Sequence, residues 1–215
     1  MTLRVFFFFI LLCVVHHRAF CRDYFQQEVN TTIHVSLDDI RHELSATEQI
    51  TYTNHSKDEL SELYFHLWPN AYRDNETALA REFFKDGSSK IESLTESQRG
   101  VIDGLNFTVN GEPVQWQLLE DTVDVCRIKL NQPLSPESTI RIETPFHIRI
   151  PDASVSRMGH DGQAYFITQW FPKPAVYDVN GWNYFPYLNR GEFYSEFGAY
   201  DVYITVPANY VVGAT

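Results

Sequence analysis

The sequence is poor in cysteine and in basic residues. Only one of its three cysteines, Cys126, lies beyond residue 21. A lone cysteine cannot form a disulfide within the chain, which excludes the class of small secreted domains stapled by disulfides. Lys and Arg number 17 against 28 Asp and Glu, for a formal net charge of −11. This balance argues against nucleic acid and anionic lipid surfaces as partners.

Complete catalytic motifs are also missing. The sequence has no G-x-S-x-G elbow, no phosphate-cradling glycine loop and no calcium loop of alternating carboxylates. The nearest approach to a zinc helix is His42-Glu43, where Ala46 replaces the second histidine of H-E-x-x-H in a segment with strand character. We reject it as a metal site, and we expect a buried strand cysteine at Cys126 rather than a nucleophile. We interpret the remaining scattered histidines beyond the N-terminal segment as structural: His34, His55, His66, His147 and His160.

The longest hydrophobic run, residues 5–15, is too short to cross a bilayer, which takes about 20 residues. With Arg4 before it and Ala19 after it, residues 1–21 have the build of a secretory signal peptide. Phe20 before Cys21 argues against a lipoprotein anchor. We therefore expect residues 22–215 to form one exported domain, periplasmic or extracellular, without a membrane span. Loss of Arg4 and Arg18 leaves 15 basic against 28 acidic residues, a formal charge near −13.

Alternation of apolar and polar residues predicts a chain of short strands. The predicted strands cover residues 25–37, 42–54, 63–68, 100–109, 114–119, 122–130, 139–150 and 200–206. Leu44, Ile50 and Tyr52 are expected in the core, as are Val202 and Ile204 with Val206 near the C-terminus. Asn110-Gly111 predicts a hairpin between residues 105–109 and 114–119, and Pro145 predicts a break in its strand.

One helix is predicted, at residues 77–85, where Leu79 and Phe83 share a face and Gly87 follows the end. The polar residues 88–99 predict a mobile loop. Many short strands with one short helix indicate an all-β fold, a sandwich or an open curved sheet of antiparallel strands.

The densest aromatic stretch is residues 165–187, where about half the residues are Phe, Trp, Tyr or Pro. Rings and prolines together predict a rigid wall that either closes the end of the core or faces a partner. Near its end, Asp178 and Trp182 flank a turn at Asn180-Gly181, and we expect them to pin that turn.

Several motifs in a fixed order resemble the N-terminal domain of the aminopeptidase N family of gluzincin zinc metallopeptidases, in its secreted bacterial form. They are ELYFHLWPNAY at 62–72, VNGEPV at 109–114, TQWFPKPAVYD at 168–178 and EFYSEFGAYDVYITVPANYVVGAT at 192–215. The resemblance implies a saddle-shaped β domain that precedes a thermolysin-like catalytic domain, which carries the zinc ligands and catalytic Glu. It therefore implies that the polypeptide continues past Thr215.

The resemblance also implies a role for the loop at residues 168–171. In the family, a Gln or Glu of this loop helps to hold the first residue of the peptide substrate. Gln169 matches that position, whereas Phe171 stands where a second acidic or amide residue is expected. Gln169 is thus the candidate for substrate binding, and its amide bonding the loop backbone is the structural alternative. Trp170, Phe171 and Tyr177 are the candidates for the pocket wall or interdomain packing.

Three hypotheses follow. The chain is the substrate-facing, non-catalytic part of a zinc aminopeptidase, with no metal of its own and with its catalytic domain and a peptide as partners. Alternatively, it is a free-standing β-sandwich module that grips a peptide or glycan with its aromatic wall. A third possibility is a catalytically dead scaffold that keeps only the fold. The sequence downstream of Thr215 separates them.

Overall fold

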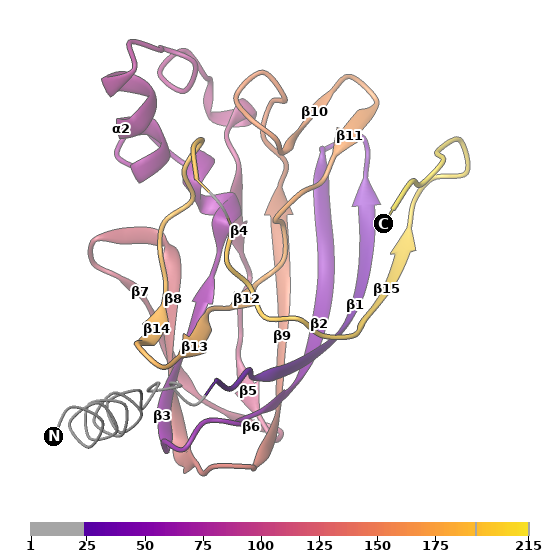
Figure 1. The fold of residues 1–215 in the computed structure, drawn as a ribbon. Helices are drawn as coiled ribbons and strands as arrows, with labels where there is room; N and C mark the ends of the chain where they lie inside the picture. The colour runs from indigo at the N-terminus through magenta and orange to yellow at the C-terminus, as the bar shows by residue number, and fades with distance from the viewer. Residues whose placement is uncertain (1–23, 192, 215) are drawn as a thin grey trace, which may run out of the picture.

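The computed structural model describes residues 24–191 and 193–214, so the predicted signal peptide and Cys21 lie outside the described residues. A seven-stranded sheet runs in the order β15-β1-β2-β9-β5-β6, with β4 also paired to β9 (Figure 1). Its strands are β1 (Glu28–Asp38), β2 (Glu43–Thr53), β4 (Val101–Asp103), β5 (Thr108–Val109), β6 (Glu112–Pro113), β9 (Thr139–Arg149) and β15 (Tyr200–Thr205).

A four-stranded sheet, β12-β3-β8-β7, packs on the first across a shared core. It consists of β3 (Leu60–His66), β7 (Gln115–Leu119), β8 (Thr122–Leu134) and β12 (Lys173–Pro174). Two small hairpins complete the β structure: β10 (Gly159–Asp161) with β11 (Ala164–Phe166), and β13 (Val176–Asp178) with β14 (Gly181–Asn183). The predicted all-β class, with sandwich-like sheets, is confirmed.

Strand periodicity places the predicted core residues correctly. Leu44, Ile50 and Tyr52 are buried on one face of β2, which pairs antiparallel with β1 and with β9. Cys126 is buried in β8, and burial raises the pKa of its thiol to about 12, as befits a structural cysteine. The residues 42–46 form a turn and the start of β2, so the rejection of a zinc helix there agrees with the fold.

The predicted helix is α2 (Ala78–Lys85). Its N-cap Thr77 accepts a hydrogen bond from the Ala80 amide and donates one to the carbonyl oxygen of Ala71. Leu79 is buried, and Gly87 beyond the helix has a positive φ of 74°. Two single-turn 3-10 helices accompany it, η1 (Trp68–Tyr72) and η2 (Glu96–Gln98). No helix within the described residues has the length and hydropathy of a bilayer-spanning segment.

Residues 88–99 form a loop, as predicted, with one 3-10 turn and mostly exposed residues, but part of it is packed. Ile91 is fully buried there, and η2 has a reciprocal capping box between Thr95 and Gln98. The buried Arg99 guanidinium donates to the side-chain oxygen of Asn75 at 2.8 Å and to the carbonyl oxygen of Ile91 at 3.2 Å. Contacts with distant residues therefore hold a segment whose local composition is polar.

The predicted hairpin is confirmed at its turn and wrong in its strands. Asn110 and Gly111 have φ values of 52° and 85°. The strands that they join are short, however, because the chain crosses to the other sheet after Pro113, where β7 pairs with β8. The predicted strand at 100–109 is likewise divided into β4 and β5.

The predicted break at Pro145 was also wrong, because β9 is continuous and pairs with β2 through Pro145 opposite Thr47. On the other side of β9, β5 pairs at residues 142–143 and β4 at residues 147–149. Pro145 lies in the gap between them. A proline is tolerated where no neighbouring strand needs its amide.

The last strand differs most from expectation. Val202 and Ile204 of β15 are 42% and 43% exposed, so the prediction that they point into the core was wrong. The strand pairs parallel with β1 at the sheet edge, unlike the antiparallel pairs elsewhere. It is anchored where the chain first meets β1: a Cβ at Gly198 would collide with the carbonyl oxygen of Val29, so only glycine fits there.

Candidate functional site

The candidate loop joins β11 to β12, and Gln169 lies in it with a left-handed φ of 52°. This backbone conformation is uncommon outside glycine and marks a constrained position. The side-chain oxygen of Gln169 accepts a hydrogen bond from Lys173 Nζ at 2.5 Å. The structural alternative for Gln169, an amide bonded to the loop backbone, is thus replaced by a bond to a cationic side chain.

Lys173 is the centre of this group of contacts. Its ammonium lies 4.9 Å from the ring centroid of Trp68 and 5.3 Å from that of Phe171, within cation–π range of both. Burial lowers the pKa of Lys173 to about 8, against the opposing effect of Glu48. The lysine is therefore a partly desolvated cation that titrates close to physiological pH.

Glu48 lies on the core face of β2 between Ala46 and Ile50 and is 3% exposed. Neither carboxyl oxygen has a hydrogen-bond partner within the described residues. Burial raises the pKa of Glu48 well above its usual range, and the attraction of Lys173 offsets this only in part. A buried carboxyl without partners is more stable as the neutral acid than as the anion.

His66 is the third buried ionisable group here. Its ring stacks on Trp68 at 4.4 Å, and its Nε2 accepts a hydrogen bond from the Phe185 amide at 3.4 Å. Burial, with a smaller effect of Lys173, lowers the pKa of His66 to about 3. The imidazole is therefore neutral at physiological pH and contributes packing rather than charge.

The structure brings together three of the four predicted site residues. Trp170 and Phe171 follow Gln169, and their rings meet edge to face at 5.6 Å. Trp170 also packs on Phe146 of β9 at 5.8 Å, and Phe171 on Tyr200 of β15 at 5.9 Å. These contacts fit the predicted role of a wall that closes one side of the core.

Tyr177 lies apart from this group. It belongs to β13, where its hydroxyl donates to Asp58 Oδ2 at 2.7 Å and its ring packs on Trp182 at 5.0 Å. The turn beside it is pinned as expected, since Asp178 Oδ1 accepts a hydrogen bond from the Asn180 amide at 2.8 Å.

Sequence reasoning missed Lys173 and Glu48, whereas His66 was interpreted as structural, in agreement with its packing on Trp68. One signal was available, because the period of two that places Leu44 and Ile50 in the core also places Glu48 there. A glutamate at such a position is a candidate for function. Nothing in the sequence distinguishes Lys173 from a solvated lysine, since two of its partners, Trp68 and Glu48, lie on distant segments.

A second missed contact joins two histidines that the sequence treats as unrelated. The rings of His42 and His160 stack at 3.7 Å with an angle of 8° between their planes, and His42 Nδ1 lies 2.7 Å from the Tyr165 hydroxyl. No group of three or more His, Cys, Asp or Glu side chains in residues 24–191 and 193–214 is arranged to hold a metal ion.

Comparison with known proteins gives only a coarse likeness. No protein-family model and no curated protein sequence matches the chain. Solved structures do. A two-domain M1 zinc metallopeptidase mutant bound to L-arginine is 15% identical, with a TM-score of 0.44 over 85% of this chain and 33% of its own. An M1 zinc metallopeptidase from Deinococcus radiodurans is 13% identical, with a TM-score of 0.39 over 64% of this chain and 25% of its own.

Leukotriene A4 hydrolase from Saccharomyces cerevisiae is 11% identical, with a TM-score of 0.34 over 57% of this chain and 15% of its own. The chain thus spans a third or less of the length of each of these proteins.

The arrangement around Lys173 favours binding over chemistry. Its cation is held by an amide oxygen and two ring faces, burial raises the pKa of the nearby Glu48 carboxyl, and the nearby His66 imidazole is neutral. The amide NH₂ of Gln169 has no partner within the described residues, so it is the group that this loop offers to a ligand.

Proposed function

We propose that this chain is the substrate-facing, non-catalytic N-terminal domain of an exported zinc aminopeptidase. The catalytic domain, with its zinc, would lie downstream in the same polypeptide and would cleave the first residue from peptides by attack of a metal-activated water. The observation that carries the proposal is the ordered run of motifs that ends in residues 168–178 and 192–215. Alone, the chain should hydrolyse nothing.

The geometry around Gln169 refines the proposed role of this residue. The resemblance implies contact with the free amine of the substrate, which requires a hydrogen-bond acceptor. Here the side-chain oxygen already accepts from the Lys173 ammonium, whose positive charge opposes a second cation beside it. The free NH₂ group instead suits a carbonyl or carboxylate oxygen. We infer that Gln169 binds the substrate through a carbonyl oxygen.

Two substitutions of Gln169 test this role in the longer polypeptide. Gln169→Ala is expected to raise KM for aminoacyl substrates about tenfold, because it removes one hydrogen bond in a partly desolvated site. Gln169→Glu should be impaired as much, since a carboxylate cannot donate. The measurement is steady-state hydrolysis of aminoacyl p-nitroanilides, with Gln115→Ala on the exposed face of β7 as the matched control. Retained or improved binding in Gln169→Glu would show that an amine is recognised instead.

A free-standing binding module is the second candidate. It is favoured by aromatic side chains that stay exposed, among them Phe166 at 54% and Tyr184 at 43%. The reading frame after Thr215 separates the two candidates. A helix with H-E-x-x-H and a further Glu downstream supports the peptidase domain, whereas an immediate stop codon supports the module.

A further inference from the structure

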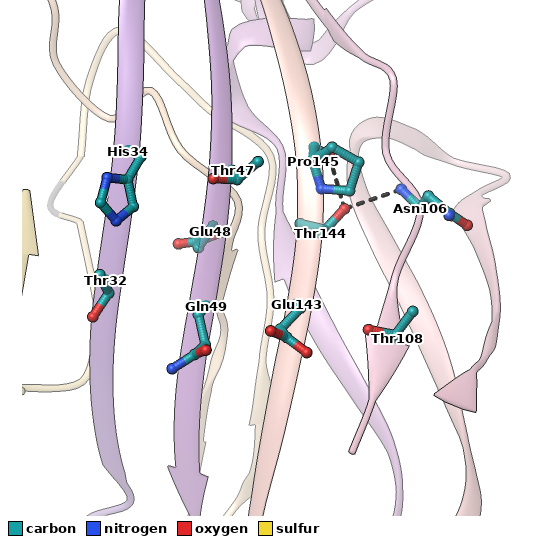
Figure 2. Close-up of a pocket in the computed structure, with 10 residues that line it drawn as sticks. All are labelled: Thr32, His34, Thr47, Glu48, Gln49, Asn106, Thr108, Glu143, Thr144 and Pro145. Carbon is teal, nitrogen blue, oxygen red and sulfur yellow. Dashed lines mark hydrogen bonds between the residues drawn. The ribbon is translucent and has the colours of Figure 1, made fainter. Parts of the chain in front are cut away.

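A polar groove crosses the seven-stranded sheet on the face that points away from the core. Its volume is about 400 Å³, in the range of small-ligand sites. Figure 2 shows its lining: Thr32 and His34 on β1, Thr47, Glu48 and Gln49 on β2, Glu143, Thr144 and Pro145 on β9, and Asn106 and Thr108 beyond them. Nothing in the proposed peptidase role uses this face.

The groove exists because β9 is unpaired at Pro145. The residues between β4 and β5 leave the sheet there and are held by a hydrogen bond from the Asn106 amide to Thr144 Oγ1 at 3.0 Å (Figure 2). This bond fixes one wall of the groove, and the twisted strands β1 and β2 form the floor and the other side. The backbone of these strands and of the segment between β4 and β5 therefore forms the groove.

The groove offers many hydrogen-bonding groups and no net charge. The hydroxyls of Thr32, Thr47 and Thr108 and the side-chain amides of Gln49 and Asn106 have no partner within the described residues, so they remain available to a ligand. The carboxylate that lines it, Glu143, pairs with Arg141 at 3.3 Å. Glu48 also lines the groove, although its carboxyl oxygens are buried.

A flat ring platform borders the groove. His34 on β1 stacks on Tyr203 of β15 with a centroid distance of 4.5 Å and an interplanar angle of 6°. Tyr203 remains 57% exposed, although an aromatic ring gains most from being covered. Together with the Pro145 ring, it supplies apolar surface beside the hydroxyl and amide groups.

We propose that this groove binds a neutral oligosaccharide. A pyranose presents hydroxyl groups at its rim, which pair with hydroxyls and side-chain amides, and apolar C–H faces, which pack on flat rings. A charged ligand gains little, because the groove has no uncompensated charge and the acidic chain repels anions. An extended peptide that adds a strand needs a free main-chain edge. β1 and β2 are paired on both sides, and the unpaired stretch of β9 at Pro145, between β4 and β5, is too short to hold a strand.

The test is an NMR titration of the purified chain with cellopentaose and maltopentaose. Trigalacturonate and a lysine tripeptide serve as charged comparators. At least one neutral sugar is expected to bind with millimolar affinity and to shift the amide signals of β1, β2 and β9 around the groove. The double variant Gln49→Ala/Asn106→Ala should weaken that binding about tenfold, because both exposed side chains are removed without a loss of packing.

Gln115→Ala, at an exposed glutamine of the other sheet, should leave the affinity unchanged. The proposal fails if neither neutral sugar shifts the groove signals, if the double variant binds as well as the parent, or if a charged comparator binds there more tightly. Shifts confined to residues 165–187 would also overturn it. These results do not decide the peptidase proposal, because the Gln169 loop packs on the core face of β9, where Trp170 contacts Phe146, and the groove lies on the outer face of the same sheet.

Discussion

Replacement of Trp68 by alanine is expected to lower the free energy of unfolding by about 3–5 kcal/mol, the usual cost of deleting a large buried ring. Trp68 is 1% exposed, and its ring meets His66 and Phe185 as well as Phe193 at 4.8 Å. It is also one of the two rings beneath the Lys173 ammonium. Its loss would leave a cavity and remove one of the two aromatic rings that contact the Lys173 ammonium.

The measurement is urea unfolding followed by far-UV circular dichroism, which does not depend on tryptophan fluorescence. Trp182→Ala is the matched control, because Trp182 is only partly buried, in the short hairpin of β13 and β14. It should cost about half as much or less. A loss below about 1 kcal/mol in Trp68→Ala would mean that this ring cluster does not organise the core.

Glu48→Gln is expected to raise stability, although Glu48 is among the most buried residues. Because burial raises its pKa in the folded state above the unfolded value, the native chain binds more protons than the unfolded chain in the window between the two values. Stability due to Glu48 therefore falls as pH rises through that window. The amide has no such titration, and we expect a gain of about 1–3 kcal/mol at pH 8 and almost none near pH 5.

The contribution of Lys173 to stability changes with pH in the opposite direction and over a different pH range. Its pKa of about 8 lies below the usual 10.5, so the unfolded state binds more protons and stability rises with pH between those values. Lys173 therefore contributes little pH dependence between pH 5 and pH 8. The lowered pKa of His66, about 3, and the raised pKa of Glu196, about 7, affect the parent and Glu48→Gln alike, so the difference between the two proteins in urea unfolding reports Glu48. Glu112→Gln, on the exposed strand β6, should leave the pH profile unchanged. Equal destabilisation of Glu48→Gln across this pH range would contradict the account of Glu48 as a buried neutral acid.

Local patterns predicted the elements whose causes are local. The period of two located β1, β2 and β9, the Thr77 cap and Gly87 bounded α2, and Asn110-Gly111 located a turn. The errors arose where contacts between residues distant in the sequence determine the structure. The alternation in β15 is that of a half-buried strand. Phe171 packs on Tyr200 on its apolar side, yet Val202 and Ile204 remain 42% and 43% exposed.

The predictions for the site were likewise correct where the cause is local and incomplete where it is not. Gln169, Trp170 and Phe171 were found because they are neighbours in a short motif. Lys173 is a candidate only because it contacts Trp68, 105 positions earlier, and interacts with Glu48 on another strand. The alternation of apolar and polar residues cannot predict that these three residues meet. The pairing of His42 with His160 was missed for the same reason.

The central claim is that these strands form a binding surface whose catalytic metal is supplied by another part of the polypeptide. The most direct test measures zinc content and aminoacyl p-nitroanilide hydrolysis in the purified 215-residue chain and in the longer natural polypeptide. The account predicts neither property in the chain alone and both in the longer protein. Stoichiometric zinc together with hydrolysis by the 215-residue chain would contradict it.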